Sequence, residues 1–154
     1  FNILAQNCSQ NVKYCQTPFY LWKWRDDSVV RKDNKLMLKT YNNLIDSGDA
    51  LIEEMFNRNK PEDADKFICF NIFDAYYVMN KPEWINLENI EYREKTELHF
   101  ANFYKKYKNR WDAVSDDVKA QSSVAIRNKY VKEGMQMESL TITQWLEKIL
   151  EKVK

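Results

Sequence analysis

The densest apolar run of the chain, residues 67–79, lies between two Lys-Pro breaks, one at Pro61 and one at Pro82. Its apolar residues do not keep to one side of a helix, which is typical of a helix that is buried on nearly all sides. Pro61 suits the first turn of a helix, and the acidic residues that follow it suit the positive end of the helix dipole. The sequence therefore predicts a central, buried helix over about residues 61–79.

The scarcity of glycine and proline favours helices in the rest of the chain as well. With 2 Gly and 3 Pro in 154 residues, the chain has few of the turns that tight β-hairpins require. We predict an all-α fold, a compact bundle of five to six helices around the central helix. We expect residues 1–154 to form a single α-helical domain, in which residues 1–24 are an N-terminal arm packed on the body.

Four further helices are expected, over 29–57, 83–112 and 115–134 and after Thr141, where Thr141 and Gln144 match a capping box. Gly48 interrupts the first of them and marks either a kink or a close contact between helices. The helix over 115–134 is expected to approach its neighbours closely through Val118, Ala125 and small Ala and Ser residues. In the helix over 29–57 the predicted core face consists of Val30, Met37, Tyr41, Leu44, Leu51, Ile52, Met55 and Phe56. In the helix over 83–112 it consists of Trp84, Leu87, Ile90, Leu98, Ala101, Tyr104 and Trp111.

Three cysteines, Cys8, Cys15 and Cys69, are compatible with one disulfide plus one free thiol or with three free thiols, and the pairing is left open. In a continuous helix Cys8 and Cys15 would lie about 10 Å apart along the axis, which exceeds the roughly 7 Å between Cα atoms that a disulfide spans. They pair with each other only if the segment is bent, and otherwise one of them reaches Cys69. Because the chain starts at Phe1 and Asn7 heads an Asn-x-Ser sequon, we expect a secreted protein, with glycosylation of Asn7 left open.

The charge balance gives no indication of a nucleic-acid or membrane partner. The formal net charge is +1, without the basic excess of nucleic-acid binders, and no apolar run approaches the roughly 20 residues of a membrane span. Residues 104–111 do mix aromatic and cationic side chains, as nucleic-acid, glycosaminoglycan or anionic-lipid sites do. We favour a simpler interpretation, in which the cations complement a helix C-terminus and the aromatic rings belong to the core.

Catalytic and metal-binding motifs are absent from the sequence. His99 is the only histidine, a poor supply for zinc, Ser-His or Cys-His chemistry. A dyad of Cys69 with His99 is one conceivable pairing, but a buried structural cysteine and a histidine on a helix surface explain the same residues more simply. No Gly-rich phosphate loop, Gly-x-Ser-x-Gly or His-Glu-x-x-His motif occurs. We therefore expect no enzyme, no catalytic residue, no metal site and no cofactor.

The aromatic residues, 14% of the chain, indicate two kinds of binding site. Aromatic rings between helices would line a cavity for a small apolar ligand, unless they fill a solid core. Tryptophans near the ends of elements would anchor a protein partner if they are exposed, and would otherwise close the edges of the core. The predicted ligand-binding residues are Phe67, Phe70, Phe73, Tyr77, Phe100, Phe103 and Tyr104, and the predicted partner-binding residues are Trp22, Trp24, Trp84 and Trp111.

Two functions follow from these patterns. The first is a secreted, non-enzymatic protein-interaction module, an effector that engages a host or partner protein through exposed aromatic and charged side chains. The alternative is a carrier of a small apolar ligand in an aromatic-lined cavity. Insect odorant-binding proteins and four-helix cytokines are similar in size and helical class, but the six-cysteine framework of the former and any motif of the latter are missing. No family is therefore assigned.

Overall fold

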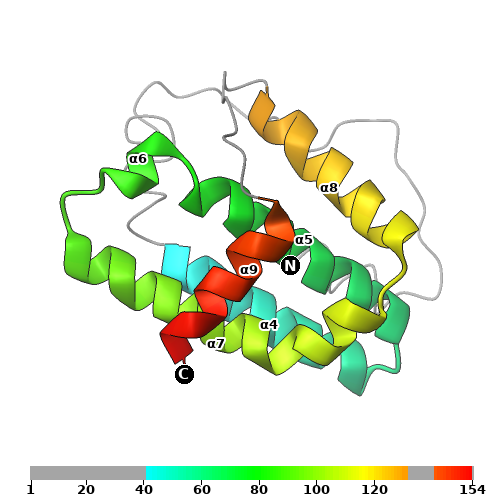
Figure 1. Cartoon of the computed structure of the whole chain (residues 1–154). Helices are drawn as coiled ribbons and strands as arrows, with labels where there is room; N and C mark the ends of the chain where they lie inside the picture. Colours follow the sequence, from blue (N-terminus) through cyan, green and yellow to red (C-terminus); the bar gives the residue numbers. More distant parts are fainter. Residues whose placement is uncertain (1–40, 132–140, 154) are drawn as a thin grey trace, which may run out of the picture.

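The central helix predicted from the sequence is present as α5, Pro61–Met79, in the computed structural model (Figure 1). The structure describes residues 41–131 and 141–153, without the side chains of residues 129–131. The limits of α5 agree with the prediction, with Pro61 in the first turn and two acidic residues beside it. Every residue from Ala75 to Met79 is buried. The helix contacts all the other described helices, which confirms its central position.

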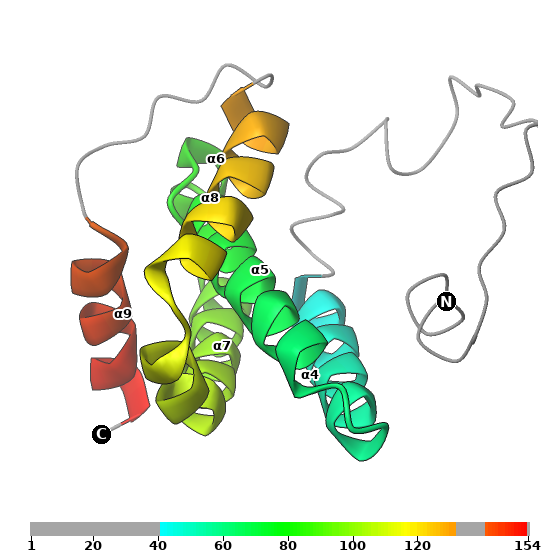
Figure 2. The ribbon, with the colours of Figure 1, turned by 90° about the vertical axis from the view of Figure 1, so that its right-hand side faces the viewer.

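Five other helices surround α5, and the described residues contain no strand. α4 and α7 pack against α5 and against each other, α8 lies along α5, and α9 packs on α7 and touches α5. In Figure 2, α9 and α4 lie on opposite sides of the pair formed by α5 and α7. The prediction of a compact all-α bundle of five to six helices is thus confirmed. The helices around α5 are α4 (Tyr41–Asn57), α6 (Pro82–Ile85), α7 (Ile90–Ala113), α8 (Asp116–Val131) and α9 (Ile142–Leu150), which a short 3-10 helix, η1 (Glu151–Val153), follows.

The connection from α4 to α5 turns sharply at Asn59. This residue adopts a φ of 57°, in the left-handed region that asparagine enters more readily than most residues. The reversal lets the amide N–H groups of Asn59 and Lys60 donate to the carbonyls of Phe56 and Met55 at the end of α4. Those bonds satisfy carbonyls that a helix end otherwise leaves without a partner, and the chain enters α5 one residue later.

Gly48 marks a close contact between helices, one of the two roles that the sequence left open. It is buried in the middle of α4, where it faces Asn71 of α5. A Cβ atom at Gly48 would lie only 2.5 Å from Oδ1 of Asn71. The Asn71 side chain is itself fixed, because its Nδ2 donates to the carbonyl of Phe67 at 2.7 Å. Only a residue without a side chain therefore fits here without displacing Asn71.

We expect Gly48→Ala to lower the free energy of unfolding by about 1 kcal/mol, because Asn71 must rotate and lose its bond to Phe67. In an Asn71→Ala background the same substitution should instead raise that free energy by up to about 1 kcal/mol, since alanine is the better helix former. Urea unfolding of the wild type, both single variants and the double variant measures the difference. The same effect of Gly48→Ala in both backgrounds would contradict the contact.

The single helix predicted over 83–112 is wrong, because the chain forms two helices there. α6 is a single turn that ends when the amides of Asn86 and Leu87 donate to the carbonyls of Pro82 and Trp84. A new helix, α7, then begins at Ile90. It is capped by Asn89, whose side chain accepts from the amide of Tyr92 at 2.9 Å. An asparagine cap of this kind makes a new helix start favourable. The break also lets the Trp84 ring turn fully into the core, with 0% of its surface exposed.

Several residues that were predicted to face the core lie at the surface instead. Ile90 and Leu98 of α7 are 56% and 43% exposed, and Leu44 of α4 is 47% exposed. In α8 it is Ile126 that is fully buried, whereas the predicted Ala125 is exposed. The buried face of α7 begins only at Thr96 and is broader than the predicted one. It consists of Thr96, Phe100, Ala101, Phe103, Tyr104, Tyr107 and Trp111.

The capping box predicted for the last helix is present. Thr141 Oγ1 accepts from the amide of Gln144, and the Gln144 side chain accepts from the amide of Thr141. No described helix is both long and apolar enough to cross a membrane. The start of the helix predicted over 29–57, the end of the one predicted over 115–134, the arm over 1–24 and the residues Asn7, Cys8, Cys15, Trp22 and Trp24 lie outside the described residues.

Candidate functional site

The aromatic residues predicted to line a ligand cavity lie within the bundle, mostly in contact with other rings. The rings of Phe100 and Phe103 stack with their centroids 5.8 Å apart, and Phe73 meets Trp111 edge-on at 5.6 Å. Phe67 and Phe70 stack at 5.9 Å on the surface side of α5, where Phe70 is 37% exposed. Phe73, Tyr77, Phe100, Phe103 and Tyr104 are each less than 10% exposed.

Two of the depressions among the described residues reach members of this aromatic set, and both are small. The one beside Phe100 and Phe103 has a volume of about 20 Å³, and a second one beside Phe103 has about 150 Å³. Pockets for drug-sized ligands have volumes of roughly 300–1,000 Å³. Where the structure places them, these rings stabilise the bundle by packing on one another.

The two described tryptophans of the predicted partner-binding set are buried in the edges of the core. Trp84 is 0% exposed, and its Nε1 donates to Glu97 at 3.0 Å. Trp111 is 8% exposed and lies between Phe73 and the ammonium group of Lys119, 4.9 Å from the ring centre. Neither ring is available as an exposed anchor. These two positions instead fit the alternative interpretation, in which they close the core.

The segment 104–111 has the arrangement that the simpler interpretation predicts. Its rings, on Tyr104, Tyr107 and Trp111, are all buried. Three of its four cations are engaged by carboxylates, and the fourth, Lys105, is exposed. Arg110 Nε and Nη2 donate to Asp65 at 2.9 and 2.8 Å, Lys108 pairs with the nearby Asp112, and Lys106 contacts Asp49 and Glu53. The mixture of rings and cations therefore joins α7 to α5, with the rings inside and the paired charges outside.

A polar seam joins α4 to α7. Lys106 Nζ contacts Asp49 at 2.7 Å and Glu53 at 2.6 Å, and the buried Tyr107 hydroxyl donates to Asp49 at 2.6 Å. One turn before Asp49 on α4, Oδ1 of Asp46 lies 2.7 Å from Nε2 of His99 on α7. The seam therefore pairs acidic residues of α4 with basic residues of α7.

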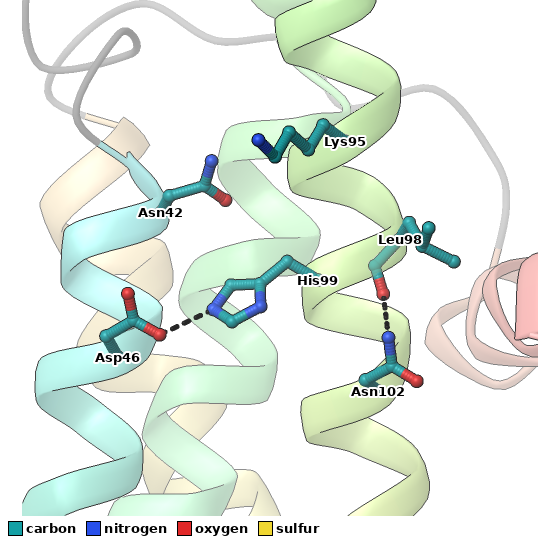
Figure 3. Close-up of a pocket in the computed structure, with 6 residues that line it drawn as sticks. All are labelled: Asn42, Asp46, Lys95, Leu98, His99 and Asn102. Carbon is teal, nitrogen blue, oxygen red and sulfur yellow. Dashed lines mark hydrogen bonds and ion pairs between the residues drawn. The ribbon is translucent and has the colours of Figure 1, made fainter.

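Figure 3 shows the depression at the end of this seam, with His99 and Asp46 directed toward each other. It has a volume of about 360 Å³ and is lined by six residues of the two helices. The imidazole and the carboxylate bind each other there, and Asn102 Nδ2 donates back to the Leu98 carbonyl. Among the described residues no three acidic, histidine or cysteine side chains gather as a metal ion would require. The lining residues are Asn42, Asp46, Lys95, Leu98, His99 and Asn102.

Cys69 is a free thiol in the middle of the core, with 0% of its surface exposed. Burial raises its pKa to about 11 from 9.0, in part offset by the nearby charge of Lys119. At neutral pH the sulfur therefore remains protonated and is a poor nucleophile. His99 bonds to Asp46 of α4. This is the structural cysteine and helix-surface histidine of the simpler interpretation, and Cys69 is a free thiol.

We expect Cys69 to resist iodoacetamide at pH 8 in the folded protein and to react once urea unfolds it, because only the unfolded chain exposes a thiol that ionises readily. Peptide mass mapping distinguishes Cys69 from the other two cysteines. Rapid alkylation of Cys69 in native buffer would contradict its burial.

The same pKa shift predicts a loss of stability in alkaline solution. Between pH 9 and about 11 the folded protein keeps the Cys69 proton while the unfolded chain loses it, so the free energy of unfolding falls as pH rises. The loss is on the order of 2 kcal/mol, and burial of Tyr104, whose pKa is raised to about 12, adds to it at higher pH. In Cys69→Ala the part of this loss that comes from Cys69 should be absent. If the free energy of unfolding fell equally with pH in the wild type and in Cys69→Ala, the prediction would be contradicted.

Another depression, which we call the α7–α9 groove, combines apolar and charged side chains. Its volume is about 340 Å³. The apolar part consists of three buried core residues, Met79, Trp145 and Ile149, and of the 53% exposed Ile85 beside them. The other lining residues are Asn80, Arg93, Glu97, Lys148 and Lys152.

Glu97 organises the charges of the groove. Its Oε1 accepts from the indole N–H of Trp84 at 3.0 Å, and its Oε2 lies 3.0 Å from Lys152 Nζ. Arg93 Nε is 4.0 Å from the same carboxylate, and its guanidinium also donates to the carbonyl of Ile85. Lys148 is exposed and has no charged partner among the described residues. The groove therefore presents one unpaired cation beside an apolar surface.

Sequence reasoning did not find this groove. Lys148 and Lys152 lie four residues apart on the last helix and its continuation, and this spacing is a visible signal of one cationic edge. The other edge, with Ile85 and Arg93, faces them only because the chain breaks between α6 and α7 and because α9 docks on α7. Comparison of the chain with protein-family models, with curated proteins and with solved structures gives no match.

Proposed function

We propose that this chain is a non-enzymatic protein-interaction module that binds a segment of a partner protein in the α7–α9 groove. The observation that supports it is the juxtaposition of buried core side chains with the unpaired Lys148. Arginine is enriched at protein interfaces, and Arg93 lines this groove together with the 53% exposed Ile85. Secretion of the protein, expected from the sequence, belongs to the same proposal.

The groove is preferred to the two other surfaces for physical reasons. In the seam between α4 and α7, His99 and Lys106 already bind carboxylates, so a partner would have to displace existing ion pairs. The depressions beside the predicted aromatic set are below ligand size. The described residues of the predicted aromatic set therefore do not favour the carrier function, and the groove offers both an apolar contact and a free charge.

Selection of peptides from a random display library tests the proposal. The wild type should enrich peptides that no longer bind a groove variant carrying Ile85→Asp and Lys148→Glu, both at exposed positions. A matched control carries Val124→Asp and Lys66→Glu, two exposed positions on other parts of the surface, and should retain binding. Circular dichroism shows that each variant is folded. Peptides that bind the groove variant as well as the wild type, or no enrichment at all, would overturn the proposal.

A further inference from the structure

The charges of the groove restrict what the partner segment can be. Three lining residues, Arg93, Lys148 and Lys152, are cationic, and only Glu97 is anionic, so the lining carries a net charge of about +2 at neutral pH. The other acidic residues of this part of the chain, Glu147 and Glu151, are exposed and do not line the groove. An anionic partner therefore complements the site, and a cationic one is repelled.

The positions of the cations favour several carboxylates over one. Lys148 and Lys152 are separated by one helical turn, about 6 Å along the axis, while Arg93 comes from α7. Cations that far apart on two elements are matched by carboxylates spread along a chain, which an acidic peptide offers and a single-headed amphiphile does not. The exposed Ile85 and the buried Trp145 and Ile149 line the same groove as these cations.

From these features we infer that the α7–α9 groove binds an acidic peptide segment with one large apolar side chain among its carboxylates. The apolar side chain lies on the floor formed by Met79, Trp145 and Ile149. A flanking carboxylate binds Lys148, which Glu97 leaves unpaired, and the positive charges of Arg93 and Lys152 attract the other carboxylates. This inference rests on the proposed function and adds the chemistry of the partner to it.

Fluorescence anisotropy with three labelled heptapeptides tests the inference. The first is Glu-Asp-Glu-Phe-Glu-Asp-Glu, the second has Ala for Phe, and the third has Lys for every acidic residue. The first should bind; the second should bind at least tenfold more weakly, because the apolar contact is lost. The third should not bind. Raising NaCl from 50 to 300 mM should weaken binding of the first peptide at least threefold, because salt screens the attraction between the exposed charges of the groove and those of the peptide.

Protein variants locate the site of binding. Lys148→Glu should weaken binding of the first peptide at least tenfold, whereas Lys66→Glu, which makes the same charge change elsewhere, should alter it less than twofold. Because both lysines are exposed, neither substitution removes a core contact. Ile85→Asp is a second groove variant that should weaken the same peptide.

The outcomes separate this inference from the proposed function. If display selection yields groove-dependent peptides that are not acidic, the inference fails and the proposed function stands. If neither the acidic peptide nor any selected peptide depends on the groove, both fail. If oleate displaces the acidic peptide at lower concentration than unlabelled peptide does, and its binding also depends on Lys148, the site is one for an anionic amphiphile and the inference is overturned.

Discussion

Trp84→Ala is expected to lower the free energy of unfolding by about 3–5 kcal/mol, the usual cost of removing a large buried ring. The side chain is completely buried and contacts Tyr41 and Tyr92 edge-on, with ring centres 5.9 and 6.4 Å away. Its indole N–H also donates to Glu97. Alanine would leave a cavity between α4, α6 and α7 and remove one hydrogen bond from the carboxylate. Urea unfolding followed by circular dichroism measures the loss.

A second substitution separates the ring from the hydrogen bond. Trp84→Phe keeps an aromatic ring but removes the donor to Glu97, and should cost about 1–2 kcal/mol less than Trp84→Ala. The neighbouring Ile85→Ala is the matched control, because its 53% exposed side chain should change stability by no more than about 0.5 kcal/mol. A cost below 1 kcal/mol for Trp84→Ala would show that this ring does not hold α6 in the core.

Trp145→Ala is expected to release the last helix from the bundle. The Trp145 ring packs on Tyr76 of α5 and Phe100 of α7, with ring centres 5.3 and 5.4 Å apart. α9 has only 9 residues, which is too short for a stable isolated helix in water. Its helical structure therefore depends on its docking on the bundle. Loss of the Trp145 ring should lower stability by about 3–5 kcal/mol, and most of this loss should affect the docking of α9.

Native-state hydrogen exchange distinguishes local release from global destabilisation. In Trp145→Ala the amides of α9 should lose protection, while those of α5 lose much less. Thr143→Ala provides a control in the same helix, because Thr143 is exposed and its replacement should leave exchange nearly unchanged. Equal loss of protection in α5 and α9 would mean that α9 unfolds only together with the whole domain.

The parts of the fold that could be predicted from the sequence depend on local chemistry. Pro61 and its acidic neighbours define the start of α5, and Thr141 with Gln144 caps α9, because both signals involve residues within one turn of each other. Gly48 indicated either a kink or a close contact, since glycine inside a helix is otherwise unfavourable, and the structure shows the contact. Sequence alone did not identify Asn71 as the neighbour, because that contact depends on the packing of two helices.

The parts that were missed depend on tertiary contacts. A spacing of three and four fits residues 83–112 well enough to hide the break, which follows from the burial of Trp84 and the cap at Asn89. The aromatic richness was compatible with either a cavity or a solid core, and the sequence could not place the ring contacts that the structure shows between helices. The groove escaped prediction because its residues come from α5, α6, α7, α9 and η1, and none of them is unusual in its own segment.

The carboxylate of Glu97 links the groove to the stability of the folded domain. It binds the buried indole of Trp84 through one oxygen and the surface ammonium of Lys152 through the other, so α6 and the C-terminal turn share a single acceptor. A partner that binds only the folded groove shifts the unfolding equilibrium by mass action. The melting temperature of the unlabelled protein would therefore rise with the concentration of its partner, and thermal scanning of candidate ligands needs no assay for activity.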